Sequence, residues 1–208
     1  MTPRNAIAAL ACLPLTLLPA CTLGGFGSAG KGEVLSVSSP VKLAPEFDVQ
    51  AYTNDDKNTA DVYLTDLSDE DLAKLFAPGG EWGEVEGQIV HLRMFVRPKP
   101  GRTPIESTAA SCTVRYIILA RGEIGIYDGA GFLQPGWAPG SDNFAGGVKG
   151  ATMRLTRSTD RFRDLLGPSE LTLRFKAQRD DEAAANIRTR AQALARFAEP
   201  VLNRTPEL

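Results

Sequence analysis

Alternation of apolar and polar residues is the feature that most constrains the fold of this chain. From Pro40 onward, apolar residues recur at every second position in short segments separated by glycine and proline. A period of two places successive side chains on opposite faces of a β-strand. The clearest segments are 47–51, 62–64, 90–96, 113–121, 123–133, 153–155 and 171–175. They predict about seven short strands in an antiparallel β-sandwich.

Three segments carry helix signals instead. Ser68 stands before the acidic residues 69–71, as a helix N-cap does, and a short helical turn is expected over 160–166, before Gly167 and Pro168. The longest helix is expected over 181–198, with an acidic start and Pro200 after its last turn. The fold class is therefore mainly β: an antiparallel β-sandwich with a short inserted helix and a C-terminal α-helix.

The expected C-terminal helix has one narrow apolar face. Ile187, Ala191, Leu194 and Ala198 follow one another at steps of four, three and four residues. Small side chains on this face suit close packing against a sheet or against a helix of a partner. We expect the helix to pack against its own domain, because a short apolar face is usually buried there.

Composition excludes several classes of protein. The chain has 208 residues, and its net charge of -2 does not indicate a nucleic-acid partner. A single histidine and three cysteines argue against a multi-ligand zinc site and against a disulfide scaffold. We therefore expect no cofactor and no metal.

The N-terminus carries a targeting pattern. Arg4 precedes an uncharged apolar stretch, 6–18, which is too short to span ~30 Å of hydrocarbon. The residues that follow, Leu18-Pro19-Ala20-Cys21, resemble the lipobox of bacterial lipoproteins. Pro19 departs from the usual residues at that position, and the alternative is an ordinary signal peptide followed by an incidental cysteine.

The resemblance implies a domain organisation and a location. Residues 1–20 would be a removed signal peptide, and Cys21 would carry the lipid that anchors the chain to a membrane. Thr22 in place of Asp implies the outer membrane, facing the periplasm. The lipidated Cys21 and a flexible Gly-rich tether would occupy residues 21–33. A β-sandwich domain over 34–178 and a C-terminal helix and tail over 179–208 would follow.

Residues that could carry catalysis are few. His91 lies in a strand without a recognisable nucleophile, and we expect it to be a histidine of the sheet face. Cys112 alternates in phase with apolar neighbours, which predicts a buried thiol without a disulfide partner. Carboxylates at 54–56 and 66–71 match no calcium-loop pattern, although a pair serving a hydrolase stays open.

Aromatic residues in the segment 129–147 are candidates for ligand binding. The segment is rich in glycine and proline and contains Phe132, Trp137 and Phe144. Aromatics at the tip of a long loop favour recognition. The alternative, which we favour, is a loop that folds over the end of the sandwich with Trp137 as a buried plug.

Arginines form the second group of candidates. Arg93, Arg97 and Arg115 lie on the polar phase of their strands, and Arg154, Arg174 and Lys176 share that phase in later strands. If the strands are neighbours, these residues form a basic face for an acidic glycan, lipid or protein. The alternative is an ordinary solvated surface.

The sequence thus predicts a lipid-anchored protein of the cell envelope. We expect a non-catalytic binding or structural/adaptor module with an envelope protein or a glycan as partner. Two alternatives stay open. One is a carboxylate-dependent envelope hydrolase, and the other is a ligand-binding module that uses the 129–147 segment.

Overall fold

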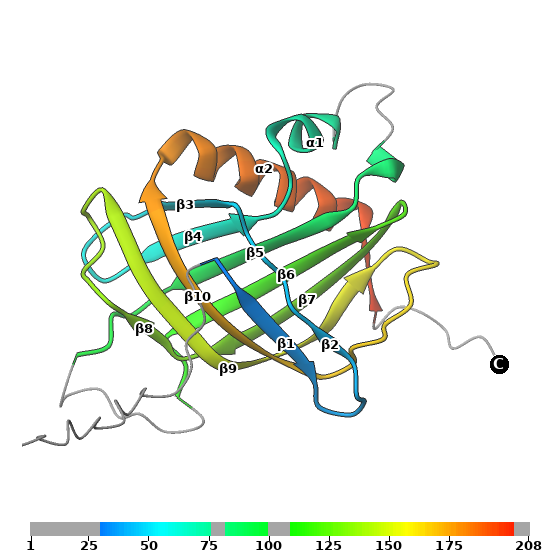
Figure 1. The fold of residues 1–208 in the computed structure, drawn as a ribbon, viewed down its shortest axis with the longest axis horizontal. Helices are drawn as coiled ribbons and strands as arrows, with labels where there is room; N and C mark the ends of the chain where they lie inside the picture. The colour runs from blue at the N-terminus through cyan, green and yellow to red at the C-terminus, as the bar shows by residue number, and fades with distance from the viewer. Residues whose placement is uncertain (1–29, 76–81, 100–108, 202–208) are drawn as a thin grey trace, which may run out of the picture.

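The fold of the described residues, 30–75, 82–99 and 109–201 of a computed structural model, is mainly β (Figure 1). Its elements are, in chain order, β1 Gly32–Ser36, β2 Lys42–Leu43, β3 Val49–Thr53, β4 Ala60–Thr65, α1 Asp69–Lys74, η1 Trp82–Glu84, β5 Gly87–Met94, β6 Cys112–Ala120, β7 Glu123–Gly131, β8 Leu133–Pro135, β9 Asn143–Ser158, β10 Ser169–Arg179, α2 Asp181–Phe197 and β11 Glu199–Pro200. The predicted mainly β class is confirmed, including the short inserted helix and the C-terminal helix.

The strands form one continuous mixed sheet that closes on itself. The strands β3, β4, β5, β6, β7, β9 and β10 follow one another by hydrogen-bonded pairing, and β10 returns to pair with β3. These seven strands are the ones that the alternation predicts. Closure depends on a short parallel pairing, Gln178 with Ala51 and Arg179 with Tyr52, whereas the other neighbours are antiparallel.

The long strand β9 joins the two halves of the sheet. Its first part pairs with β10 and its second part pairs with β7, with register shifts in both pairings. The sheet therefore bends across β9 without a break, and it does not divide into two separate sheets. Gly129 in β7 permits the close approach, because a Cβ there would lie 1.9 Å from the carbonyl oxygen of Thr152.

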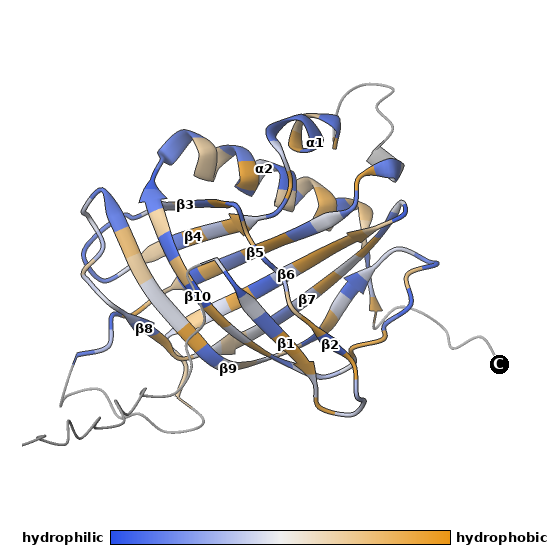
Figure 2. Cartoon of the chain, viewed as in Figure 1, coloured by the Kyte–Doolittle hydropathy of each residue, from blue (hydrophilic) through white to orange (hydrophobic). Residues whose placement is uncertain are grey.

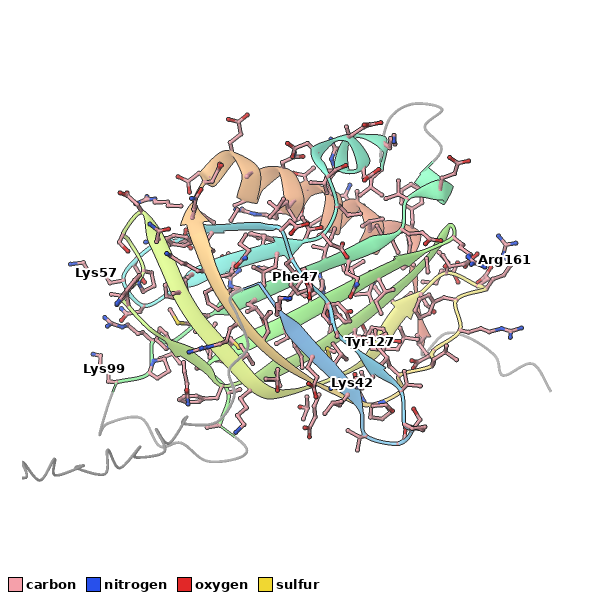
Figure 3. The ribbon with its side chains drawn as sticks, viewed as in Figure 1. Lys42, Phe47, Lys57, Lys99, Tyr127 and Arg161 are labelled. Atoms are coloured by element: carbon pink, nitrogen blue, oxygen red, sulfur yellow. The ribbon has the colours of Figure 1, made fainter. Side chains whose placement is uncertain are left out.

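The inner face of the closed sheet encloses the larger core. Aromatic side chains fill its centre: Tyr52, Tyr116, Tyr127, Phe144 and Phe175 are buried there. Figure 3 shows Tyr127 and Phe47 among the strands, whereas Lys57 and Arg161 lie at the edges of the molecule and point into solvent. Cys112 belongs to this core as a buried free thiol, as predicted. Burial raises the pKa of the Cys112 thiol to about 12.

A second core lies on the outer face, beneath the helices. Figure 1 shows α2 running across β3, β4 and β5 with α1 beside it, and Figure 2 shows apolar residues in the strands below. The four predicted residues of α2, at 187, 191, 194 and 198, are buried in this layer. The expectation that α2 packs against its own domain is confirmed.

Capping explains where the two helices begin. The Ser68 hydroxyl accepts from the backbone N–H of Asp71, so Ser68 is the N-cap that the sequence predicts. Asp180 caps α2 by accepting from the N–H of Ala183 at 2.8 Å. Arg157 donates to the carbonyl oxygens of Ala195 and Ala198 and thereby satisfies the other end of α2.

Two details differ from the sequence predictions. The segment 160–166 is not a helical turn: it consists of turns and bends, and Asp164 organises it by accepting from the backbone N–H groups of Leu166 and Gly167. The ordered domain begins before residue 34, because β1 starts at Gly32 and Gly30 already bonds to the backbone of Arg174. The expected signal peptide, Cys21 and most of the tether lie outside the described residues.

No helix among the described residues is long and apolar enough to cross a membrane.

Candidate functional site

The segment 129–147 is mostly strand, so the long loop expected from the sequence is a short hairpin. It contains the end of β7, all of β8 and the start of β9. Phe144 is fully buried between Tyr52 and Phe175, with ring centroids 5.4 Å from each, and it is not available to a ligand. Phe132 is half-buried.

Trp137 is exposed, so the expectation of a buried plug is wrong. Its exposed fraction is 59%, the joint third largest among the large apolar residues described. The hairpin tip that carries it is well tied. Gly136 donates to the carbonyl oxygen of Ala145 at 2.8 Å, and the Tyr52 hydroxyl donates to the carbonyl oxygen of Ser141. Trp137 is thus held in water on an anchored hairpin.

A shallow trough that reaches Gly136, the residue before Trp137, lies on the outer face of β8, β9 and β10. Its volume is about 410 Å³. Register explains the hollow: Gly147 in β9 stands between Gln134 in β8 and Arg174 in β10, and Gly147 has no side chain to fill the space. Lys176 lines the same wall one step along β10. A second hollow of about 500 Å³ contains Trp137 itself, and we call the two together the Trp137 groove.

The predicted basic face is divided between two places. Arg174 and Lys176 belong to the Trp137 groove. Arg93 and Arg115 lie together on the outer face of β5 and β6. Arg97 follows β5, is half-buried and is absent from both sites.

Arg93 and Arg115 line a pocket of about 220 Å³ at the side of α2. We call it the arginine pocket; its lining residues are Asp61, Tyr63, His91, Arg93, Arg115, Arg188, Ala191 and Gln192. Cross-strand register assembles it, because His91 stands opposite Tyr63 on one side and opposite Arg115 on the other. Helix α2 closes the pocket with Arg188.

Two short contacts order the polar groups of this pocket. The Asp61 carboxylate and His91 Nε2 are 2.6 Å apart, and both side chains are about one-fifth exposed, at 20% and 23%. The His91 ring stacks on Tyr63 with centroids 4.5 Å apart and planes nearly parallel. His91 is therefore a sheet-face histidine, as predicted, but one held by two neighbours.

The charges around Asp61 are predominantly positive. Burial acts to raise the pKa of Asp61, but the hydrogen bond with His91 and the positive charges of His91, Arg93 and Arg188 outweigh it and lower that pKa. Burial also raises the pKa of Tyr63, and the neighbouring Asp61 charge adds to the effect. Asp61 thus stays ionised and Tyr63 stays neutral at physiological pH.

The carboxylate clusters noted in the sequence have local structural roles. Asp56 accepts from the backbone N–H groups of Asn58 and Thr59 and so closes a turn. Asp71 accepts from the capping hydroxyl of Ser68. Within the described residues, no group of three or more His, Cys, Asp or Glu side chains is placed to hold a metal ion.

Sequence reasoning missed four residues of the arginine pocket: Asp61, Tyr63, Arg188 and Gln192. Asp61 and Tyr63 lie on the same face of the sheet as His91 in the next strand, and alternation indicates which residues of one strand share a face. Which residues of two strands stand opposite one another depends on the pairing register, and the register cannot be read from the sequence of a single strand. Arg188 lies about 70 residues or more further along the chain than the strand residues of the pocket, in a helix whose polar face gave no indication of what it would meet.

Comparison of this chain with protein-family models, with curated proteins and with solved structures finds no match. The function therefore has to be argued from the two surface sites.

Proposed function

We propose that this chain is a lipid-anchored binding module of the cell envelope that holds a glycan strand in the Trp137 groove. The observation that carries the proposal is a large aromatic side chain, 59% exposed, next in the chain to a trough with a glycine floor. Exposed apolar surface of this kind on an anchored element is typical of recognition sites. The proposal involves no catalytic step.

The chemistry of the groove fits a sugar chain. The face of a pyranose ring presents C–H groups that pack on an indole ring, and the flat floor at Gly136, Ala145 and Gly147 leaves room for the next sugar. Gln134 offers an amide for hydroxyl groups, and the cations Arg174 and Lys176 favour a glycan that carries carboxylates. The groove is open along the sheet, which suits a polymer.

The anchor part of the proposal is supported by Leu18-Pro19-Ala20-Cys21 alone. Two or three acyl chains on Cys21 would hold the chain at the membrane, since each buried CH₂ contributes about 0.8 kcal/mol. The Gly-rich residues after Cys21 would let the domain reach a wall polymer next to that membrane.

Binding can be measured with purified peptidoglycan sacculi as the probe. The full chain in detergent is sedimented with sacculi, and the fraction bound is compared between wild type and Trp137→Ala. We expect binding to fall about tenfold or more, because stacking on an aromatic ring is lost, while the melting temperature stays unchanged. Equal binding by both chains would contradict the glycan proposal.

Phe197→Ala is the matched control. Phe197 is as exposed as Trp137, at 59%, but it lies at the end of α2 and lines neither part of the groove. We expect this variant to bind sacculi as wild type does. If Phe197→Ala loses as much binding as Trp137→Ala does, sacculi bind to exposed apolar side chains in general. The Trp137 groove would then have no specific role.

The anchor is tested separately. Cys21→Ser should move the chain from the membrane fraction to the soluble periplasmic fraction, because the acylated sulfur is removed. Unchanged partitioning would refute the anchor without affecting the sacculus experiment.

A further inference from the structure

We propose that the arginine pocket is a second binding site, specific for a phosphate monoester group. It is separate from the Trp137 groove: the two sites share no lining residue, and they lie on different strands of the sheet. The proposal therefore does not depend on the glycan proposal.

The balance of charge in the pocket is the first argument. Three guanidinium groups reach it, from Arg93, Arg115 and Arg188, and the carboxylates at hand are Asp61 and the adjacent Asp128. Both carboxylates are engaged: Asp61 with His91 at 2.6 Å, and Asp128 with Arg115 Nε at 2.7 Å. Within the described part of the chain, Arg93 and Arg188 have no carboxylate at ion-pair distance. A bound anion would balance these two charges.

Two of the three cations, Arg115 and Arg188, are held in place before any ligand binds. The Arg115–Asp128 pair is fixed further by Thr156, whose hydroxyl donates to the other oxygen of Asp128 at 2.6 Å. The Arg188 guanidinium carbon lies 5.9 Å from the centre of the Tyr63 ring, within the range of a cation–π contact. Tyr63 in turn stacks on His91. Cations that are already ordered lose little entropy when an anion arrives.

Size and donor geometry select the class of anion. A volume of about 220 Å³ accommodates a phosphate group with its first linking atoms, but it does not enclose a nucleotide. Planar guanidinium groups from β5, β6 and α2 line the hollow, so an anion inside it would have arginine side chains of three elements around it. A tetrahedral phosphate with three free oxygens can use donors from three directions, whereas a planar carboxylate has two oxygens.

The single histidine of the chain gives a direct readout. The ring resonances of His91 are followed by NMR in the full chain in detergent micelles while inorganic phosphate is added at constant ionic strength and constant pH. We expect a saturable shift with phosphate and a much weaker one with acetate. The same titration with soluble dihexanoyl phosphatidic acid and with glycerol 3-phosphate shows whether a lipid headgroup or a small phosphate ester binds more tightly.

Arg93→Gln and Arg188→Gln test the assignment of the donors. Each is expected to weaken phosphate binding by about tenfold or more, since one charge-assisted contact is lost. Arg121→Gln is the control: Arg121 is 92% exposed at the β6–β7 hairpin, at the other end of strand β6. It should leave phosphate binding unchanged.

Three results would overturn the proposal. One is the absence of a saturable His91 shift with any of the phosphate compounds. Another is an equal response to acetate at matched ionic strength, and the third is an equal loss of binding in Arg121→Gln and Arg93→Gln. Because Arg188 lies on the exposed face of α2, Arg188→Gln keeps the test decisive even if Arg93→Gln destabilises the sheet.

Discussion

The two cores of this molecule lie on opposite faces of the same strands and are built from different side chains. The inner core contains six buried tyrosines and phenylalanines among its valines, leucines and alanines, together with Met94, Met153 and Cys112. The outer core is aliphatic apart from Tyr63, and alanines at 184, 191 and 198 bring α2 close to the sheet. Aromatic rings therefore help to fill the volume that the sheet encloses, whereas the alanines of the helix layer let the helix backbone approach the strands closely.

The outer core also has a boundary that the inner core lacks. Ile89 and Ile117 are buried beneath the helix, but two residues away on the same strands stand His91 and Arg115. Ala191 of α2 belongs to the outer core and also lines the arginine pocket. The pocket is therefore the place where the apolar contact between helix and sheet gives way to polar groups.

The largest effect is expected from emptying the inner core. Phe144→Ala removes a ring packed against Tyr52 and Phe175 and should lower the free energy of unfolding by about 3–5 kcal/mol, because enclosed neighbours cannot collapse into the space. Urea denaturation measures this. A loss below about 1 kcal/mol would show that the inner core is loosely packed.

A smaller loss is expected in the outer core. Leu194→Ala truncates a fully buried residue of α2 and should cost about 2–3 kcal/mol, at the lower end of such substitutions, because α2 can shift toward the sheet. The same urea experiment applies, with the solvent-facing Ala185→Gly as a control for helix propensity at about 1 kcal/mol. If Leu194→Ala costs more than Phe144→Ala, the helix layer is the dominant core.

The inner core contains polar groups that need hydrogen-bond partners, and the Tyr127 hydroxyl is one of them. Tyr127 donates its hydroxyl to Asp164 at 2.6 Å, and Asp164 organises the turn after β9. Tyr127→Phe should lower the free energy of unfolding by about 1 kcal/mol, since one hydrogen bond is lost without a cavity. Asp164→Asn, which can still accept from the hydroxyl, should cost less; a larger cost in Asp164→Asn would assign the main role to the turn.

Much of this division between faces could be predicted from alternation alone. Alternation around residues 62, 90, 114 and 171 indicates which side chains share a face. Together with the other alternating segments, it predicts all seven strands of the closed sheet. The strands β1, β2, β8 and β11 escaped notice. β2, β8 and β11 have only two or three residues, too few alternations to be distinguished from loops, and β1 begins in the expected tether and has adjacent apolar residues, Val34 and Leu35, in place of alternation. Closure through a two-residue parallel pairing leaves no local signal either.

The candidate sites were predictable only in part. Trp137, Arg93 and Arg115 were candidates from their residue types and phase. Whether Trp137 is buried depends on how the hairpin packs, and which arginines meet depends on register and on the path of α2. These are tertiary properties. The sequence therefore supplied the residue types of the sites, and the fold decided how they are grouped.

The smallest loss of stability is expected at Asp61, in the arginine pocket that borders the outer core. The pKa of Asp61 lies below its ordinary value of 3.8 in the folded state. Its stabilisation is therefore present above the unfolded pKa and is lost as the pH falls through the lower folded pKa. Asp61→Asn should cost under about 1 kcal/mol at pH 7, since the pair with His91 is partly exposed.

That difference between wild type and Asp61→Asn should shrink as the pH falls from 7 to 2, because Asp61 becomes increasingly protonated and neutral. Urea denaturation at pH 7 and pH 2 provides the comparison, and Asp48→Asn, an exposed position outside the arginine pocket, serves as the control. A difference that persists undiminished at low pH would mean that Asp61 stabilises the sheet through the shape and hydrogen bonds of its side chain. The electrostatic contrast between the two parts of the outer core would then be wrong.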